Sequence, residues 1–209
     1  MRQHPVLLSE VIGVDGQRRY RLSVFCDVRN HSVPLEVCKA CPSCIAVNGG
    51  ELDGSGCVRC APPEESVPST LAPAGRALHR GVIAVDEAVL VRDIVALFVE
   101  RRLRLVVVTD VDGRAGGVVH ESQLLRQIQD QARARANATR LGWESMHLEP
   151  ASALMRPAAT IAESIPLRTA LAAMSDAHQR QLLVLDEQGR PVGVLFDVDA
   201  LHALYGHDD

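Results

Sequence analysis

The residues best suited to chemistry in this chain are its six cysteines, which all fall between Cys26 and Cys60. Their spacing is Cys-x11-Cys-x2-Cys-x2-Cys-x12-Cys-x2-Cys. Tight Cys-x2-Cys steps deliver paired thiolates to tetrahedral zinc. Glu10 and Asp15 interrupt the apolar run that a signal peptide needs, so we expect a cytoplasmic protein. In that reducing compartment clustered cysteines indicate a metal site rather than disulfides.

Zinc takes four thiolates, so two of the six cysteines are spare. Cys26 and Cys60 end short segments that look like strands, and Cys38-Lys39-Ala40-Cys41-Pro42 looks like a metal-binding knuckle. The expected ligands are Cys26, Cys38, Cys41 and Cys60, with Cys44 and Cys57 in reserve.

Two other interpretations stay open for these cysteines. Cys38-x2-Cys41-x2-Cys44 with a remote cysteine is also an arrangement that holds iron–sulfur clusters. Structural free thiols or disulfides are the second alternative. Stoichiometric zinc in a colourless protein would favour the knuckle, and a brown protein would favour the cluster.

The part of the sequence that follows the cysteines contains an internal repeat. Leu105 to Val119, LVVVTDVDGRAGGVV, recurs as Gln181 to Leu195, QLLVLDEQGRPVGVL, at a constant offset of 76 residues. Each copy has two apolar runs around a turn rich in Gly and charged residues, which predicts two paired strands. Two copies at so long a period indicate a duplicated domain.

Periodicity around each copy predicts the order β-α-β-β-α. In the first copy the apolar residues between Val89 and Arg102 have helical spacing, and in the second those from Leu167 to Met174 do. A hairpin is expected around Asp15-Gly16 near the N-terminus. Ala61 to Gly75, with four prolines and no period, reads as a linker.

Composition limits the classes of function. The formal charge of −4 and an aromatic content of 3% give no reason to expect nucleic acid or an anionic membrane as a partner. No apolar run is long enough to span a membrane. The chain has no G-x-S-x-G, P-loop, H-E-x-x-H or G-x-G-x-x-G pattern, so we expect no enzyme activity.

The duplication, the D-x-x-G-R turns and the segment Gly193 to Asp199, GVLFDVD, resemble a CBS-domain pair, or Bateman module. The resemblance implies an α+β fold in which two β-α-β-β-α repeats form a pseudo-two-fold pair. Together with the linker it divides the chain into a cysteine-rich zinc-binding module (1–60), a linker (61–74), repeat 1 (75–129), a connector (130–149) and repeat 2 (150–205).

The cysteine segment has a resemblance of its own. Its outline, V-x-C…V-x-L-x-x-C-x-x-C-P…V-x-C, is similar to small cysteine-rich modules fused to CBS pairs in some bacteria. That likeness implies a β-rich, zinc-ribbon-like module ahead of the repeats.

CBS pairs sense adenine nucleotides such as AMP, ADP or ATP in clefts between their repeats. In the family, Gly-apolar-apolar-Thr/Ser-x-x-Asp opens the last helix, where the acid binds the ribose and the hydroxyl lies near phosphate. Asp199 keeps the acid here, whereas Phe196 replaces the hydroxyl residue. The first repeat has His120 and Gln123 at these positions, so we expect one nucleotide per pair. Asp199 can equally be a first-turn acid that stabilises its helix.

The resemblance gives the expected nucleotide site as Asp199, Phe196, Thr160, Ala158 and Arg156. Arg156 is expected to reach phosphate, although a surface role is the alternative.

The function expected from all of this is that of a regulatory sensor. It would act as a cytoplasmic homodimer that binds an adenine nucleotide and presents its zinc module to an unidentified protein partner. The alternative is a CBS pair with decayed ligand sites that serves only as a dimerisation scaffold.

Overall fold

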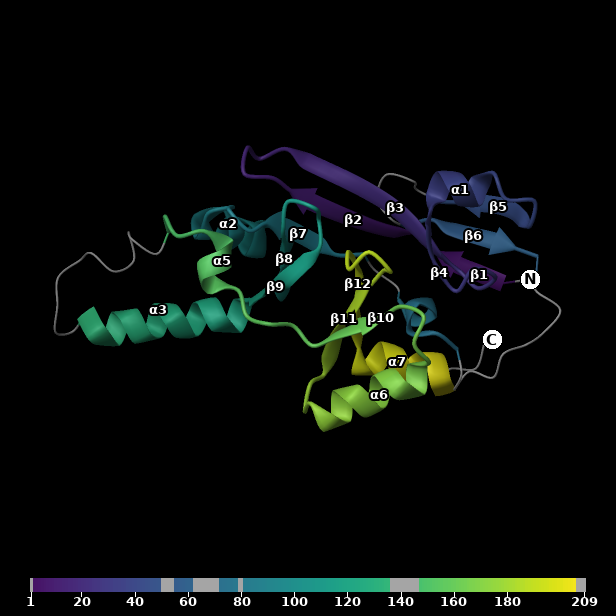
Figure 1. The fold of residues 1–209 in the computed structure, drawn as a ribbon. Coiled ribbons are helices and arrows are strands. Elements are labelled where there is room, and N and C mark those ends of the chain that lie inside the picture. Colours follow the sequence, from purple (N-terminus) through teal and green to yellow (C-terminus); the bar gives the residue numbers. More distant parts are fainter. Residues whose placement is uncertain (1, 50–54, 62–71, 79–80, 136–146, 206–209) are drawn as a thin grey trace. The chain divides into compact units, whose positions relative to one another are not determined.

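The computed structural model describes residues 2–49, 55–61, 72–78, 81–135 and 147–205 (Figure 1). The chain divides into two compact units. The first comprises residues 1–10, 20–82 and 159–209, and the second residues 11–19 and 83–158. No helix in the described part of the chain is long and apolar enough to cross a membrane.

The second unit holds the elements of repeat 1. They are β7 (Ile83–Asp86), α2 (Val91–Arg101), β8 (Leu105–Thr109), β9 (Ala115–His120), α3 (Glu121–Arg135) and the short α5 (Ala151–Leu154). Strand β8 pairs in parallel with β7 and antiparallel with β9. The expected order β-α-β-β-α is confirmed for this repeat. Its core packs α2 against the sheet through Ile94, Val106 and Val119.

The elements of repeat 2 lie in the first unit. They are β10 (Thr160–Ala162), α6 (Leu167–Asp176), β11 (Gln181–Leu185), β12 (Pro191–Phe196) and α7 (Asp197–Tyr205). Strand β11 lies between β10 and β12, with the same parallel and antiparallel pairing. In Figure 1, α6 and α7 lie side by side on this sheet. The mixed α+β fold is therefore confirmed in both repeats.

The first unit also contains the cysteine segment. Its elements are β1 (Arg2–Pro5), β2 (Leu7–Ile12), β3 (Arg18–Cys26), β4 (His31–Pro34), α1 (Leu35–Lys39), β5 (Cys44–Asn48) and β6 (Cys57–Cys60). The end of β2 and the start of β3, within residues 11–19, belong to the second unit. Strand β6 lies between β1 and β5, antiparallel to both. The expected turn at Asp15-Gly16 joins β2 to β3, and Gly16 has a φ of 74°, which glycine adopts without strain.

Each repeat borrows a short segment from the start of the other repeat in the sequence. The 3₁₀ helix η2 (Ala74–Ala77) is buried in the core of repeat 2 with Leu167 and Leu195. Helix α5 is buried in the core of repeat 1. This exchange explains why the units part at residues 82/83 and 158/159 rather than at the ends of the repeats. Residues 62–71 of the expected linker lie outside the described residues.

Candidate functional site

The cysteine cluster is built from four elements of the first unit, β3, α1, β5 and β6, and from the turn that follows α1. Cys26 ends β3, Cys38 lies on α1, and Cys41 follows it in a turn. The amide of Cys41 donates to the carbonyl of Cys38 and that of Cys44 to Cys41, each at 3.0 Å. These two consecutive turns present Cys38, Cys41 and Cys44 one after another, and Cys60 comes from the end of β6.

Five of the six thiols influence one another electrostatically. Burial, followed by negative charge on Cys60, Cys44, Cys26 and Cys41, raises the pKa of Cys38 to about 12. Burial, followed by negative charge on Cys44, Cys26 and Cys41, also raises the pKa of Cys60, whereas a hydrogen bond with Cys38 lowers it. Cys57 takes no part in either shift, because side chains alternate along a strand and Cys57 lies three positions before Cys60.

A cavity of about 90 Å³ opens in this cluster. Its lining includes Cys26, Cys38, Cys41 and Cys60, the four cysteines that the sequence predicts as ligands. His4 and Asp27 also line it, with His4 Nε2 3.8 Å from Asp27 Oδ2.

Four thiols are the type of donor set that zinc takes in proteins. Their geometry stops short of a metal site. In the described part of the chain, no three His, Cys, Asp or Glu side chains are grouped so that they could hold a metal ion. Zinc therefore remains a prediction.

Three of the expected nucleotide ligands lie in the first unit, toward one end of the repeat 2 sheet. Thr160 begins β10 and pairs with Leu183, the middle residue of β11. Phe196 ends β12 opposite Gln181, the first residue of β11, so it lies at the end of the sheet where β10 and β11 begin. Asp199 follows in the first turn of α7 and is half-buried, whereas Thr160 and Phe196 are exposed. The register thus places Thr160 and Phe196 on the two outer strands, toward the same end of the sheet, and Asp199 follows Phe196 in the chain.

The other two expected ligands, Arg156 and Ala158, belong to the second unit. There the amide of Arg156 donates to Val118 and its carbonyl accepts from Val118, both at 2.9 Å. A Cβ on the neighbouring Gly117 would lie 2.6 Å from the Arg156 carbonyl oxygen, so this approach requires glycine. The Arg156 side chain itself is exposed. Its backbone has a structural role whatever its guanidinium binds.

The residues of repeat 1 that match Phe196 and Asp199 are engaged within the second unit. Burial lowers the pKa of His120, and the positive charge of Arg156 lowers it further. Gln123 Nε2 donates a short hydrogen bond to the carbonyl of Leu154 and so ties α3 to α5. This amide contact gives Gln123 a structural role in place of ribose binding.

The arginines that precede the second strand of each repeat form equivalent ion pairs. Arg104 Nη1 lies 2.9 Å from Glu121 Oε2, and Arg180 Nε lies 2.8 Å from Asp197 Oδ2. Arg180 lowers the pKa of Asp197 through this hydrogen bond. In each repeat the acid is the first residue of the last helix. A structural role therefore accounts for both arginines.

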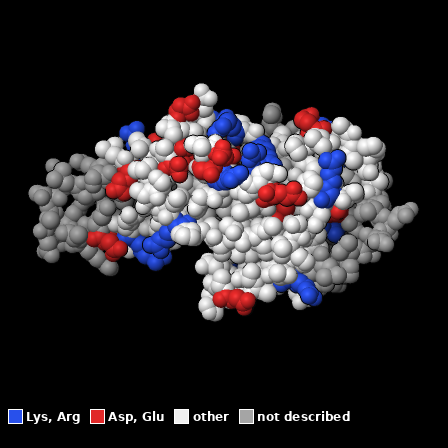
Figure 2. Space-filling view, in the orientation of Figure 1, with Lys and Arg blue, Asp and Glu red and all other residues white. Residues whose placement is uncertain are grey.

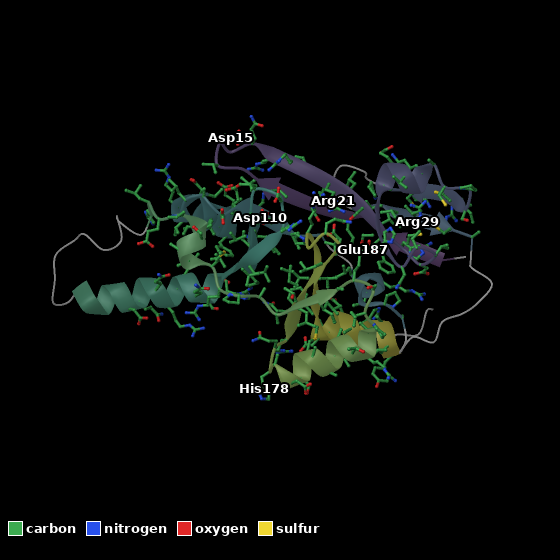
Figure 3. The ribbon with its side chains drawn as sticks, in the orientation of Figure 1. Asp15, Arg21, Arg29, Asp110, His178 and Glu187 are labelled. Atoms are coloured by element: carbon green, nitrogen blue, oxygen red, sulfur yellow. The ribbon has the colours of Figure 1, made fainter. Side chains whose placement is uncertain are left out.

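Sequence reasoning missed a buried carboxylate between the cysteine segment and repeat 2. Glu163 is 2% exposed, and its Oε1 accepts from the amide of Ser32 on β4 at 2.8 Å. Nearby, Arg21 Nη1 lies 3.2 Å from Oδ2 of the buried Asp186. In Figure 3 this ion pair can be located from the labels of Arg21 and of Glu187, the residue that follows Asp186 in the chain. No local pattern reveals this contact, because Glu87 at the matching position of repeat 1 is exposed.

On the face shown in Figure 2, basic and acidic side chains are interspersed, in keeping with 22 basic and 26 acidic residues in the chain.

Comparison with solved structures gives the fold its context. CBSX2 in complex with AMP has 21% sequence identity, a TM-score of 0.50 and coverage of 63% of this chain and 94% of its own. A CBS domain protein from Pyrobaculum aerophilum complexed with AMP has 22% identity, a TM-score of 0.51 and coverage of 65% and 99%. The CBS domain of a bacterial CNNM/CorC family Mg²⁺ transporter in complex with ATP has 17% identity, a TM-score of 0.52 and coverage of 66% of this chain and 91% of its own.

At these identities the likeness establishes the fold. No curated protein matches the sequence. The CBS domain family model matches residues 74–130 and 151–206, which together make up more than half of the chain. The chain therefore belongs to the CBS-domain family.

Proposed function

We propose that this chain is a regulatory protein whose CBS pair binds an adenine nucleotide and whose residues 1–60 bind zinc. The observation that carries the nucleotide proposal is that Thr160, Phe196 and Asp199 lie toward the same end of the repeat 2 sheet, where β10 and β11 begin and β12 ends. Asp199 stands in the first turn of α7, where a carboxylate can accept hydrogen bonds from two ribose hydroxyls. The exposed Phe196 ring offers a face on which an adenine base can stack. Arg156 and Ala158, the other two residues that the sequence predicts as ligands, belong to the second unit.

Solved relatives with this fold support the choice of ligand. Two of them are complexes with AMP and one is a complex with ATP. In this chain Gln123 donates to the Leu154 carbonyl and has no charged acceptor to offer. One nucleotide per CBS pair is therefore expected.

Isothermal titration with AMP, ADP and ATP tests this proposal. Asp199→Ala should weaken binding by roughly tenfold to a hundredfold, because hydrogen bonds to a charged group are worth about 1.5–3 kcal/mol. Glu187→Ala is the matched control, since it removes the same charge from the opposite end of β11. It should leave the affinity unchanged. Two equal sites, or equal effects of the two variants, would show that the nucleotide binds elsewhere.

The scaffold hypothesis has one observation in its favour. Phe196 occupies a position where the family has a hydroxyl, and repeat 1 has neither the hydroxyl nor the acid. Under that hypothesis none of the three nucleotides binds, and the CBS pair only dimerises and presents the cysteine module to a partner.

The zinc proposal rests on the four thiols that line one cavity. Elemental analysis of protein prepared without chelators should find about one zinc per chain. Iron with a brown colour would favour the iron–sulfur alternative on Cys38, Cys41 and Cys44. Absence of any metal would refute both.

A regulatory role follows if the ligand favours one arrangement of the protein over another. A nucleotide bound at the start of α7 would then alter how the cysteine module is presented to a protein partner, with no catalytic step in this chain.

A further inference from the structure

Cys44 is not among the cavity-lining cysteines, yet it lies directly across from one of them. Strands β5 and β6 are antiparallel, and their register pairs Cys44 with Cys60. Residues directly opposite on such strands project to the same face with Cβ atoms about 4.5–5.5 Å apart. Cys60 therefore has two kinds of thiol neighbour, the other cavity cysteines and a cross-strand partner.

The local geometry suits a bond between these two sulfurs. A disulfide needs Cβ atoms about 3.5–4.5 Å apart and Cα atoms about 4.4–6.8 Å apart, so a small backbone adjustment is sufficient. The register shifts between Cys44 and Ala46, and such a bulge gives the backbone at Cys44 room to adjust. Both thiols are half-buried, so a small oxidant can reach them.

We propose that Cys44 and Cys60 form an oxidisable thiol pair, and that hydrogen peroxide or a related hydroperoxide joins them in a disulfide that removes Cys60 from the metal site. The disulfide is independent of zinc, whereas the release of metal rests on the zinc function proposed above. Cys44, which is not among the four expected metal ligands, is thus assigned a role as the disulfide partner of Cys60.

The chemistry needs one equivalent of peroxide. The Cys44 thiolate attacks one peroxide oxygen, the O–O bond breaks, and the other oxygen leaves as water after taking up a proton. The resulting sulfenic acid is attacked by the sulfur of Cys60, which releases a second water as the S–S bond forms. Overall two thiols are oxidised, one peroxide is reduced, and Cys60 gives up its bond to the metal. Three cavity thiolates then remain, too few for a closed structural zinc site.

Peptide mapping tests the disulfide directly. Trypsin cleaves after Lys39 and Arg59, so Cys60 lies alone on peptide 60–76 while Cys44 lies on peptide 40–59. Cys26 and Cys38 lie on separate peptides, 22–29 and 30–39. After one equivalent of hydrogen peroxide, mass spectrometry of the full-length protein should find peptide 60–76 linked to 40–59.

Two variants identify the partner of Cys60. The link should persist in Cys57→Ser, whose side chain lies on the other face of β6, and should be lost in Cys44→Ser. A link from Cys60 to peptide 22–29 or 30–39, a link that survives Cys44→Ser, or no link at all would overturn the proposal.

A chromogenic zinc indicator reports the consequence for the metal. Wild-type and Cys57→Ser protein should release zinc as the disulfide forms, and Cys44→Ser should release it at least tenfold more slowly. Zinc retained after complete linkage would refute the release step. Protein that contains no zinc but forms the disulfide would refute the zinc function and leave the thiol pair established.

Discussion

The stability of the first unit should depend on pH through Glu163, because only one of its two carboxylate oxygens has a hydrogen-bond donor in the described part of the chain. Oε1 accepts the Ser32 amide at 2.8 Å, whereas the buried Oε2 has no hydrogen-bond partner among the described residues. Burial raises the pKa of Glu163 above its ordinary value of 4.5, and the charge of Asp186 also raises it. The ionised form is therefore disfavoured in the folded first unit.

The sign of the pH dependence follows from that shift. An acid whose pKa is raised by folding contributes stability that is fully present below its unfolded value and is lost as the pH rises through its folded value. Glu163→Gln keeps an oxygen for the Ser32 amide and removes the charge. An unsatisfied buried charged acceptor costs about 1–3 kcal/mol, so at pH 8 the variant should be more stable by that amount. Near pH 4 the difference should vanish, because wild-type Glu163 is then protonated.

Scanning calorimetry between pH 4 and pH 8 measures this effect. For a chain of this size the melting temperature should rise by about 2–4 °C per kcal/mol at pH 8. Glu87→Gln, the exposed equivalent in repeat 1, is the matched control and should change nothing at either pH. A Glu163→Gln protein that is less stable at pH 8, or a difference that does not depend on pH, would refute the assignment of an unsatisfied carboxylate.

Three further predictions concern other parts of the chain. Cys38→Ser should lose zinc and melt at a lower temperature, because the free energy of metal binding at such sites contributes to folding. Cys57→Ser should retain its zinc and the wild-type melting temperature. Elemental analysis and calorimetry measure the two effects. Light scattering at micromolar protein should give about twice the chain mass of 22.6 kDa, because α2 leaves apolar surface such as Val99, 74% exposed, for a second copy; a monomer would contradict this. Arg180→Ala should leave the melting temperature within error, because its pair with Asp197 is exposed to solvent.

The repeats could be predicted from the sequence because their signals are local. Helical spacing predicts a helix from Val89 to Arg102, and α2 runs from Val91 to Arg101. Turn chemistry is equally local. Asp110 and Asp186 each accept the backbone amides of their own D-x-x-G-R turns, including those of Arg114 and Arg190 at 2.8 Å.

The pairing of distant segments could not be predicted in the same way. Leu35 belongs to an apolar run in the sequence, but it begins α1 with Pro34 at the N-cap. Cys44 looked like a reserve ligand, and only the register of β5 on β6 places it opposite Cys60. Such registers depend on contacts between residues far apart in the chain, and no periodicity encodes them.

Within the first unit, packing contacts connect the cysteine cluster with the expected nucleotide-binding residues of repeat 2. A Cβ on Gly75 would lie 2.4 Å from the ring of Phe25, so the segment before repeat 1 packs tightly against the residue next to Cys26. The carbonyl of Glu163, just beyond β10, accepts the Gly75 amide at 2.9 Å. Leu7 of β2 is buried in the repeat 2 core. Because these contacts are close-packed, a displacement of β10 must be accommodated at Phe25 or at the Glu163–Ser32 contact. The proline-rich sequence after the cysteines therefore does not make the cysteine segment and repeat 2 mechanically independent.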